Sequence, residues 1–315
     1  MEPKSNFKIT KISIDPLYKC PLHCKHCFVE NEDITMFDDK KVSEDDWRLS
    51  IRKILELAKY IKIDEICLGG GEPLFSKGKI VAILDELQHR VSIMCTVMTS
   101  GYCINDEIIK KLKLVDEVSV SLHGHNSEIH DSFVEREGAF NTVINNIGLM
   151  IYNGINVSIN SSLRRNSIDN IKHIVGLGYL LGVKHVRLLP VMYCGRAGYN
   201  LIPTIEEFDY AMEMVIHYKN IYQGEPLLIL NGLYNQSNLN KKKDFNELQL
   251  EILPDLRYGV RLLGLDTKVY VVGSMLNDSI EDMIDTIDKY YNKIKLLNHD
   301  SELSGGDTPF EIIYC

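Results

Sequence analysis

The chain has 315 residues, a length that suits one large domain or one domain with an appendage. Hydrophobic residues make up 45% and charged residues 25%, which are ordinary globular values, and the net charge of −9 argues against a surface built to bind nucleic-acid phosphates. Because the N-terminus lacks an apolar signal segment and no stretch reaches the roughly 18 apolar residues of a membrane span, we expect a cytoplasmic protein without nucleic-acid or membrane partners.

Short segments rich in Val and Ile alternate along the chain with amphipathic helical patterns. The first helix is predicted to begin after Ser43, a good N-cap residue, and a later one to end at Gly154. Six strands are predicted: Ile9–Ile14, Glu65–Leu68, Ile93–Met98, Glu117–Leu122, Ile155–Asn160 and His185–Leu189. The helices between and after them are predicted at about 43–60, 79–89, 105–112, 140–152, 167–181 and 204–218.

Six strand–helix units in series imply parallel strands joined by right-handed crossovers. So regular an alternation favours an α/β fold with a partial (β/α)6 TIM-like barrel over an open doubly wound sheet, although periodicity alone suits both. We assign residues 1–221 to this core. Residues 222–315 are expected to form a small α+β accessory region, with strands at 227–230 and 268–272 and a helix at 279–297.

Three of the eight cysteines stand within eight positions just after the first predicted strand: Cys20, Cys24 and Cys27. In parallel α/β folds, chemistry gathers at the carboxyl ends of strands. Structural zinc needs a fourth Cys or His, which His23 or His26 could supply. An iron–sulfur cube held by three cysteines instead leaves one iron open to another ligand. The spacing favours the cluster and leaves zinc as the alternative.

A second motif follows the second predicted strand, where Gly70, Gly71, Glu72 and Pro73 stand in a row. Glycines let a backbone approach a ligand closely, the glutamate offers a carboxylate, and the proline fixes the turn. Alone, such a run also suits a phosphate-binding loop or a tight turn.

Together, Cys-x3-Cys-x2-Cys after one strand and Gly-Gly-Glu-Pro after the next resemble the radical S-adenosylmethionine (radical SAM) enzymes, over about residues 8–220. The resemblance implies one [4Fe-4S] cluster on the three cysteines, with SAM bound at its open iron. It implies that Gly70, Gly71 and Glu72 bind the methionine amine of SAM, with Pro73 closing the turn. His26 stands at the family's position for an aromatic or His before the third cysteine.

Further motifs follow in the family's order, and "EIHDSFVEREGAF" at 128–140 resembles its peptide-modifying and sulfatase-maturing branch. The resemblance implies SAM contacts from six more residues: Thr99, Ser100, Ser121, Arg136, Asn160 and Leu189. Ser100 departs from the family's usual Asn. Arg136 would pair with the SAM carboxylate, which suits a planar bidentate donor, although an exposed helix-end charge is the alternative. Adenine would pack on Leu189.

Three residues are candidates for catalysis: His123, Cys194 and Cys315. His123 could be a base near the substrate or a structural histidine at a strand end. Each thiol could return a hydrogen atom to the substrate or be an inert packed cysteine. In the family, a C-terminal extension called SPASM or twitch holds auxiliary clusters on many cysteines. This chain has only Cys194 and Cys315 after residue 103, so we expect a degenerate extension without such a cluster.

The resemblance implies that an external flavodoxin or ferredoxin supplies an electron, that SAM is cleaved reductively, and that the resulting 5′-deoxyadenosyl radical abstracts a substrate hydrogen. Without an auxiliary cluster as electron sink, a reaction with no net oxidation is favoured, such as epimerisation or rearrangement. We expect a peptide substrate, as in the maturation of ribosomal peptides (RiPPs). A small molecule (sugar, amino acid or cofactor precursor) is the alternative.

Two other functions rank lower. Methyl transfer to RNA does not suit an acidic chain with no basic appendage. A zinc-stabilised binding module without catalytic activity would need a fourth ligand and would leave the glycine–glutamate motif without a role.

Overall fold

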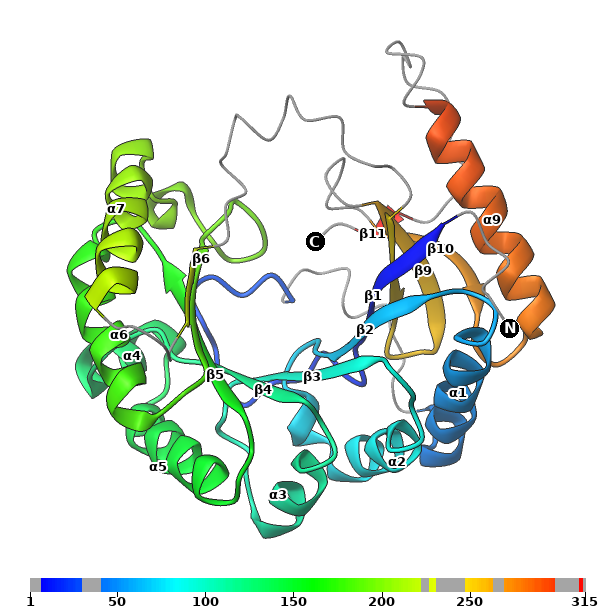
Figure 1. The fold of residues 1–315 in the computed structure, drawn as a ribbon, viewed down its shortest axis with the longest axis horizontal. Coiled ribbons are helices and arrows are strands. Elements are labelled where there is room, and N and C mark those ends of the chain that lie inside the picture. Colours follow the sequence, from blue (N-terminus) through cyan, green and yellow to red (C-terminus); the bar gives the residue numbers. More distant parts are fainter. Residues whose placement is uncertain are drawn as a thin grey trace. The chain divides into compact units, whose positions relative to one another are not determined.

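A computed structural model describes residues 7–29, 41–221, 227–230, 247–262, 269–297 and 312–313 (Figure 1). They form two compact units, each assembled from separate stretches of the chain. The first unit is drawn from within 1–18, 32–95 and 242–315, and the second from within 19–31 and 96–241. A division of the chain after residue 221 stays a prediction.

The sheet of the first unit is centred on strand β1 (Lys8–Ile14), which has a parallel neighbour on each side. In spatial order its strands are β2 (Ile63–Leu68), β1, β8 (Glu247–Ile252), β9 (Arg257–Leu262), β10 (Val269–Ser274) and β11 (Ile312–Ile313). Pairing from β8 to β11 is antiparallel. The described C-terminal strands therefore extend the sheet that begins at β1.

The helical elements of the first unit are α1 (Glu44–Leu57), the 3-10 helix η3 (Pro73–Phe75), α2 (Lys77–Leu87) and α9 (Ile280–Leu297). Helix α1 begins as predicted: the Ser43 hydroxyl accepts from the Asp46 amide, and the Asp46 carboxylate accepts from the Ser43 amide. One face of α1 is buried, and its buried apolar residues are Trp47, Ile51, Ile54 and Leu57.

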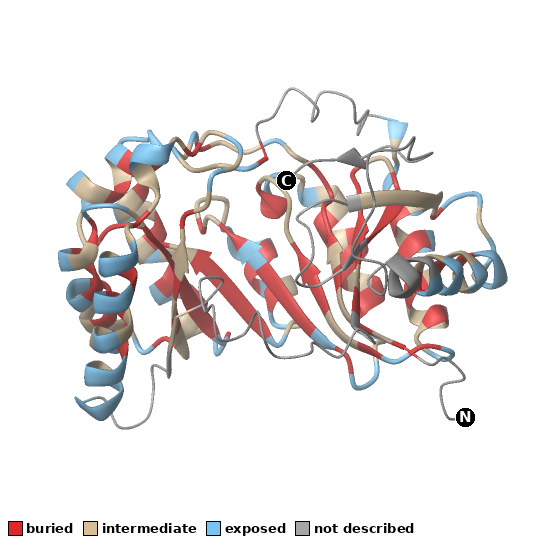
Figure 2. Ribbon diagram, turned by 90° about the horizontal axis from the view of Figure 1, so that it is seen from above, coloured by how far each residue is buried: buried red, intermediate tan, exposed pale blue. Residues whose placement is uncertain are grey.

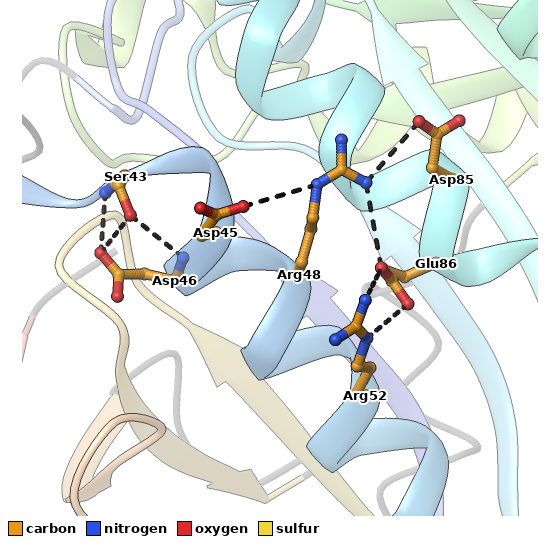
Figure 3. A network of polar contacts seen from close by, with 7 residues as sticks. All are labelled: Ser43, Asp45, Asp46, Arg48, Arg52, Asp85 and Glu86. Atoms are coloured by element: carbon orange, nitrogen blue, oxygen red, sulfur yellow. Dashed lines mark hydrogen bonds and ion pairs between the residues drawn. The ribbon is translucent and has the colours of Figure 1, made fainter.

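Charged side chains join α1 to α2 (Figure 3). The Arg52 guanidinium donates to both carboxylate oxygens of Glu86, at 2.9 and 2.7 Å. Arg48 Nη1 lies 3.7 Å from Asp85 and 3.8 Å from Glu86. The hydrogen bonds from Arg52 lower the pKa of Glu86.

The second unit is built on five parallel strands in sequence order. They are β3 (Met94–Thr99), β4 (Glu117–Ser121), β5 (Val157–Leu163), β6 (His185–Pro190) and β7 (Leu227–Leu230). The helical elements are α3 (Asp106–Leu112), α4 (Ser127–Val134), α5 (Ala139–Tyr152), α6 (Ile168–Leu181), η4 (Tyr199–Leu201) and α7 (Ile205–Ile221). In Figure 1 the α-helices of this unit lie outside the curved row of strands.

The two faces of the second unit's sheet differ in chemistry. Apolar residues such as Val118, Val120 and Ile159 are fully buried, and Figure 2 shows these strands as mostly buried, with the helices exposed on their outward sides. The alternate positions of β4 and β5 are polar: Glu117, Ser119, Ser121, Ser158, Asn160 and Ser162. A polar inner face is the surface on which polar ligands can bind.

All six predicted strands and six predicted helices occur in the described residues, with ends shifted by a few residues. The accessory strands near 227–230 and 268–272 and the helix at 279–297 also occur. Helix α4 and strand β8 were not predicted. Cys315 lies outside the described residues.

Candidate active site

The cysteine loop, residues 19–29, is held against the last turn of α4. The amide of His23 donates to the carbonyl of Val134 at 3.0 Å, and the amide of Lys25 to that of Phe133 at 3.0 Å. These carbonyls would otherwise lack partners at the end of the helix. Glu135 adopts a left-handed conformation (φ 52°) and ends the helix at this point. The unpredicted helix α4 is thus the support of the cysteine loop.

The three cysteines of this loop are partly exposed. Cys20 and Cys24 pack with Tyr102 against a small apolar cluster formed by Leu22, Val134 and Ala139. Burial, together with the charges of Cys20 and Cys27, raises the pKa of Cys24 to about 12. At neutral pH the sulfur of Cys24 is therefore a thiol, and it would lose its proton on binding a metal centre because ligating thiols bind deprotonated.

The loop that follows β6, residues 191–197, packs onto the cysteine loop. The Arg196 amide donates to the carbonyl oxygen of Cys27 at 2.9 Å. Gly195 has φ +55°, and a Cβ at this position would overlap that same carbonyl oxygen. The charge of Arg196 lowers the pKa of Cys24, although burial and the neighbouring thiols outweigh it.

This packing brings the predicted catalytic residue Cys194 next to the cysteine loop. Burial and the charge of Cys27 raise the pKa of Cys194, so its sulfur stays a thiol at neutral pH. Cys194 and Cys27 are 167 positions apart in the sequence, and only the fold shows their proximity. The catalytic role of Cys194 stays a prediction.

His26, between the second and third cysteines, is linked to the inner face of the sheet. Its Nε2 lies 3.1 Å from the hydroxyl of Ser162, which lies 3.0 Å from Nδ1 of His123. Burial and the charges of Arg164 and Arg196 lower the pKa of His26 to about 4. Burial also lowers the pKa of His123 well below its ordinary value. Both rings are therefore neutral at pH 7.

The predicted SAM contacts on the strands lie in two neighbouring rows of the inner face. Ser121 is the partner of Asn160 across β4 and β5, and Ser162 is the partner of Leu189 across β5 and β6. Asn160 is 6% exposed, and its Oδ1 accepts no hydrogen bond. A buried carbonyl oxygen without a donor is costly, so it marks a place where a bound molecule could supply one.

Other predicted contacts have local partners. The amide of Gly101 donates to Thr99 Oγ1 at 3.0 Å, and that of Tyr102 to Ser100 Oγ at 3.3 Å, so both hydroxyls hold the turn after β3. Arg136 is exposed, and its guanidinium lies over the Tyr102 ring at 5.5 Å from the centroid. Arg136 therefore reaches an aromatic ring that packs against the same apolar cluster as Cys20 and Cys24.

The glycine motif lies in the first unit, where it is fastened to the segment after β1. The Gly69 amide donates to Ile14 at 2.9 Å, and the Gly71 amide donates to Leu17 at 3.0 Å. Gly70 has φ +88°, and a Cβ there would come within 2.7 Å of the Leu17 carbonyl oxygen. The fully buried Glu72 accepts from the Leu74 amide at 3.1 Å, and Pro73 begins η3.

The residues of the second unit fit the predicted cluster and SAM. Three thiols from one loop are the donor set of an open-sided iron–sulfur cube. The buried Nδ1 of His26 and Oδ1 of Asn160 lack partners and could bind polar groups of SAM.

In the described part of the chain, no three His, Cys, Asp or Glu side chains are gathered as ligands of a single metal ion. No helix among the described residues is long and apolar enough to cross a membrane.

Sequence reasoning missed several residues of this site: Tyr102, Ser162 and Arg164. Ser162 follows Asn160 by two positions, so strand periodicity places it on the same face. The contacts of Tyr102 and Arg164 join distant segments and have no local signal.

Comparisons with known proteins agree with this site. The chain matches the Radical SAM superfamily over residues 14–176. It is 24% identical to Fe-coproporphyrin III synthase of Methanosarcina barkeri (strain Fusaro / DSM 804) over 202 residues, 63% of this chain and 48% of that protein. It is also 24% identical to PqqA peptide cyclase of Streptomyces rochei over 230 residues, 69% of this chain and 58% of that protein. The chain thus spans about half the length of these curated relatives.

Proteins of known structure have a similar fold. The crystal structure of Streptococcus suis SuiB bound to S-adenosylmethionine superposes with a TM-score of 0.68 at 16% identity, over 91% of this chain and 68% of SuiB. At this identity the likeness concerns the fold alone, and it confirms the predicted α/β class with a partial barrel and a smaller C-terminal part. Since the superfamily match covers more than half of its length, the chain belongs to the radical SAM superfamily of enzymes.

Proposed function

We propose that this enzyme modifies a peptide by a reaction without net oxidation, such as epimerisation or rearrangement, using one [4Fe-4S] cluster and SAM. The observation that supports it best is the thiol of Cys194, held beside the cysteine loop by the bond from the Arg196 amide to the Cys27 carbonyl. A thiol at this place is suited to return a hydrogen atom to a substrate radical.

The cluster and SAM, when bound, supply a 5′-deoxyadenosyl radical that takes a hydrogen atom from a substrate carbon. The Cys194 thiol then gives its hydrogen atom to the other face of that carbon: the S–H bond breaks, a C–H bond forms, and a thiyl radical remains. One electron from an external flavodoxin or ferredoxin and one proton from water restore the thiol. The substrate is inverted at one centre and is neither oxidised nor reduced.

A peptide substrate has support from similar proteins. One relative is named as a peptide cyclase, and the His130-Asp131 motif resembles the peptide-modifying branch. Another relative is named for an iron porphyrin, which favours a small molecule as the second candidate. The acidic chain gives no support to an RNA substrate.

The test uses the anaerobically reconstituted enzyme with a flavodoxin reductant in deuterium oxide. Synthetic peptides encoded beside the gene and Fe-coproporphyrin III serve as probes, and the release of 5′-deoxyadenosine and the product mass are measured. We expect about four irons per chain and stimulation by one peptide, which gains one deuterium. Cys194→Ala should still release 5′-deoxyadenosine but leave the peptide without deuterium, whereas Cys103→Ala should behave as the native enzyme.

Two results would contradict the proposal. Stimulation by Fe-coproporphyrin III and by no peptide would indicate the small-molecule function. A peptide product lighter by two hydrogens, from an enzyme with about eight irons, would indicate oxidative chemistry with an auxiliary cluster.

A further inference from the structure

Three side chains that are distant in sequence form one line of hydrogen bonds at the cysteine loop. His26 Nε2 lies 3.1 Å from Ser162 Oγ, and Ser162 Oγ lies 3.0 Å from His123 Nδ1. The backbone amide of Ser162 also donates to His123 Nδ1, at 3.2 Å. Ser162 and His123 are 6% and 5% exposed, so water does not take the place of these bonds.

The donors and acceptors in this line have only one consistent arrangement. Because a backbone amide can only donate, Nδ1 of His123 carries no proton. Ser162 Oγ faces that bare nitrogen, so the hydroxyl hydrogen points to His123. The same oxygen then accepts from His26, whose Nε2 must carry the ring proton. In the tautomer that this arrangement selects, with the ring proton on Nε2, the Nδ1 of His26 is a bare acceptor.

His123, at one end of this line, is held in place by hydrogen bonds to its backbone. The carbonyl oxygen of His123 accepts from Arg164 Nη1 at 3.0 Å and from Asn170 Nδ2 at 3.3 Å. The amide of His123 donates to His130 Nδ1 at 3.1 Å. His123 therefore cannot shift without breaking bonds to three different side chains.

At the other end of this line of hydrogen bonds, the His26 ring is held in place by aromatic contacts, and its Nδ1 has no partner. The His26 ring stacks on Phe133 at a centroid distance of 4.9 Å and meets the edge of His123 at 4.8 Å. Its Nδ1 is buried and has no hydrogen-bond partner. A buried acceptor without a donor is costly unless a bound molecule completes it.

From this geometry we infer that Ser162 and His123 are positioning residues for SAM: they fix the tautomer and orientation of His26, whose bare Nδ1 accepts a hydrogen bond from bound SAM. Neither residue touches the cofactor in this arrangement. The inference rests on the family of the chain and is independent of whether the substrate is a peptide.

The test measures SAM binding and needs no substrate. The Kd of radiolabelled SAM is determined on the reconstituted enzyme by equilibrium dialysis, and the electron paramagnetic resonance spectrum of the reduced cluster is recorded with and without SAM. Ser162→Ala should weaken SAM binding about 3- to 10-fold, the effect of one lost hydrogen bond, and reduce the spectral change on SAM addition. Iron content should stay native. Ser161→Ala, whose side chain points to the other face of β5, is the matched control.

A double-mutant cycle separates positioning from general stability. In a His26→Phe background, Ser162→Ala should cause no further loss of SAM affinity, because its effect passes through His26. Additive losses would overturn the inference, as would native affinity in Ser162→Ala itself.

The pair His123→Asn and His123→Gln gives a second test that does not depend on Ser162 variants. Asn keeps an acceptor at the place of Nδ1 and should bind SAM nearly as the native enzyme, whereas Gln should resemble Ser162→Ala; equal affinities would also contradict the inference.

Discussion

The backbone amide of Arg196 donates to the carbonyl oxygen of Cys27 at 2.9 Å, which joins the loop after β6 to the loop of the predicted cluster ligands. The bond depends on a close backbone approach, since Gly195 lies directly over the same carbonyl. The position of the third cysteine is therefore set by residues that are more than 160 positions away in the sequence.

Gly195→Ala should displace the cysteine loop. The new Cβ would overlap Cys27 O and come within 2.5 Å of the Cα of Phe28, at a backbone φ of +55°. We expect a loss of about 1–3 kcal/mol in the free energy of unfolding and a lower iron content after reconstitution. Urea unfolding and iron analysis measure both. Gly148→Ala, where a Cβ meets nothing within 4 Å, is the control and should retain all its iron.

Removal of any one of the three loop cysteines should abolish cluster assembly. Replacing Cys20, Cys24 or Cys27 by alanine leaves two thiolates, too few for a cube with one open iron, so iron should fall from about four per chain to near zero. Colorimetric iron analysis and visible absorbance follow the loss. Cys103→Ala should keep the cluster; if it also lost iron, the assignment of the ligands would be wrong.

Asp131→Ala should loosen the start of α5. The two carboxylate oxygens of Asp131 accept from the amides of Gly138 and Phe140, each at 2.7 Å, so they cap this helix. Loss of such a cap costs about 1–2 kcal/mol, measurable as a lower urea midpoint. Ser132→Ala, at an exposed neighbour, should unfold like the native protein, and an equal shift in both variants would exclude the capping role.

Glu117→Gln should destabilise the protein at neutral pH and less so in acid. Glu117 is 4% exposed and pairs with Arg187 Nη1 at 2.7 Å. Burial raises the pKa of Glu117, but the hydrogen bond and charge of Arg187 outweigh it, and the net pKa is lowered. A lowered carboxyl pKa stabilises the fold above the unfolded value of about 4.3, and this contribution disappears as pH falls through the folded pKa.

At pH 7 the substitution should cost about 3 kcal/mol, the lower end for removing one partner of a buried ion pair. Urea unfolding of both proteins between neutral and acidic pH measures the difference. Glu56→Gln, which removes an exposed ion pair with Lys59, is the control with a much smaller effect. A difference between native and Glu117→Gln proteins that does not shrink in acid would contradict the assignment.

Local signals in the sequence account for most of the fold. Ser43 caps α1 as predicted, and the regular alternation of Val- and Ile-rich segments with helical patterns led to the confirmed fold class. Helix α4 is no shorter than the predicted α3, but its buried face combines His130 with Phe133 and Val134, so its apolar periodicity is weak. Strand β8 has a local signal that was overlooked, because Glu247–Ile252 alternates polar residues with the buried Leu248, Leu250 and Ile252.

The site is predictable only where a motif is continuous. The three cysteines and the Gly70-Gly71-Glu72-Pro73 run are visible in the sequence, and the match confirms the family that they indicate, while the roles of the single residues stay predictions. The bond between Ser162 and His26 spans 136 positions. No local propensity encodes such a contact, because it depends on which strands become neighbours and on how their faces alternate.

The parallel pairing of β1 with β8 has a consequence for synthesis. Thr10 donates to the carbonyl oxygen of Leu248, 238 positions later, at 3.1 Å. At about 5–20 residues per second, a ribosome needs roughly 10 to 50 s to reach the partner of a strand it made first. Throughout that time one edge of β1 stays open to strands of other chains, and such edges promote aggregation. We therefore expect the chain to need protection by chaperones during its synthesis, and no longer once β8 has paired with β1.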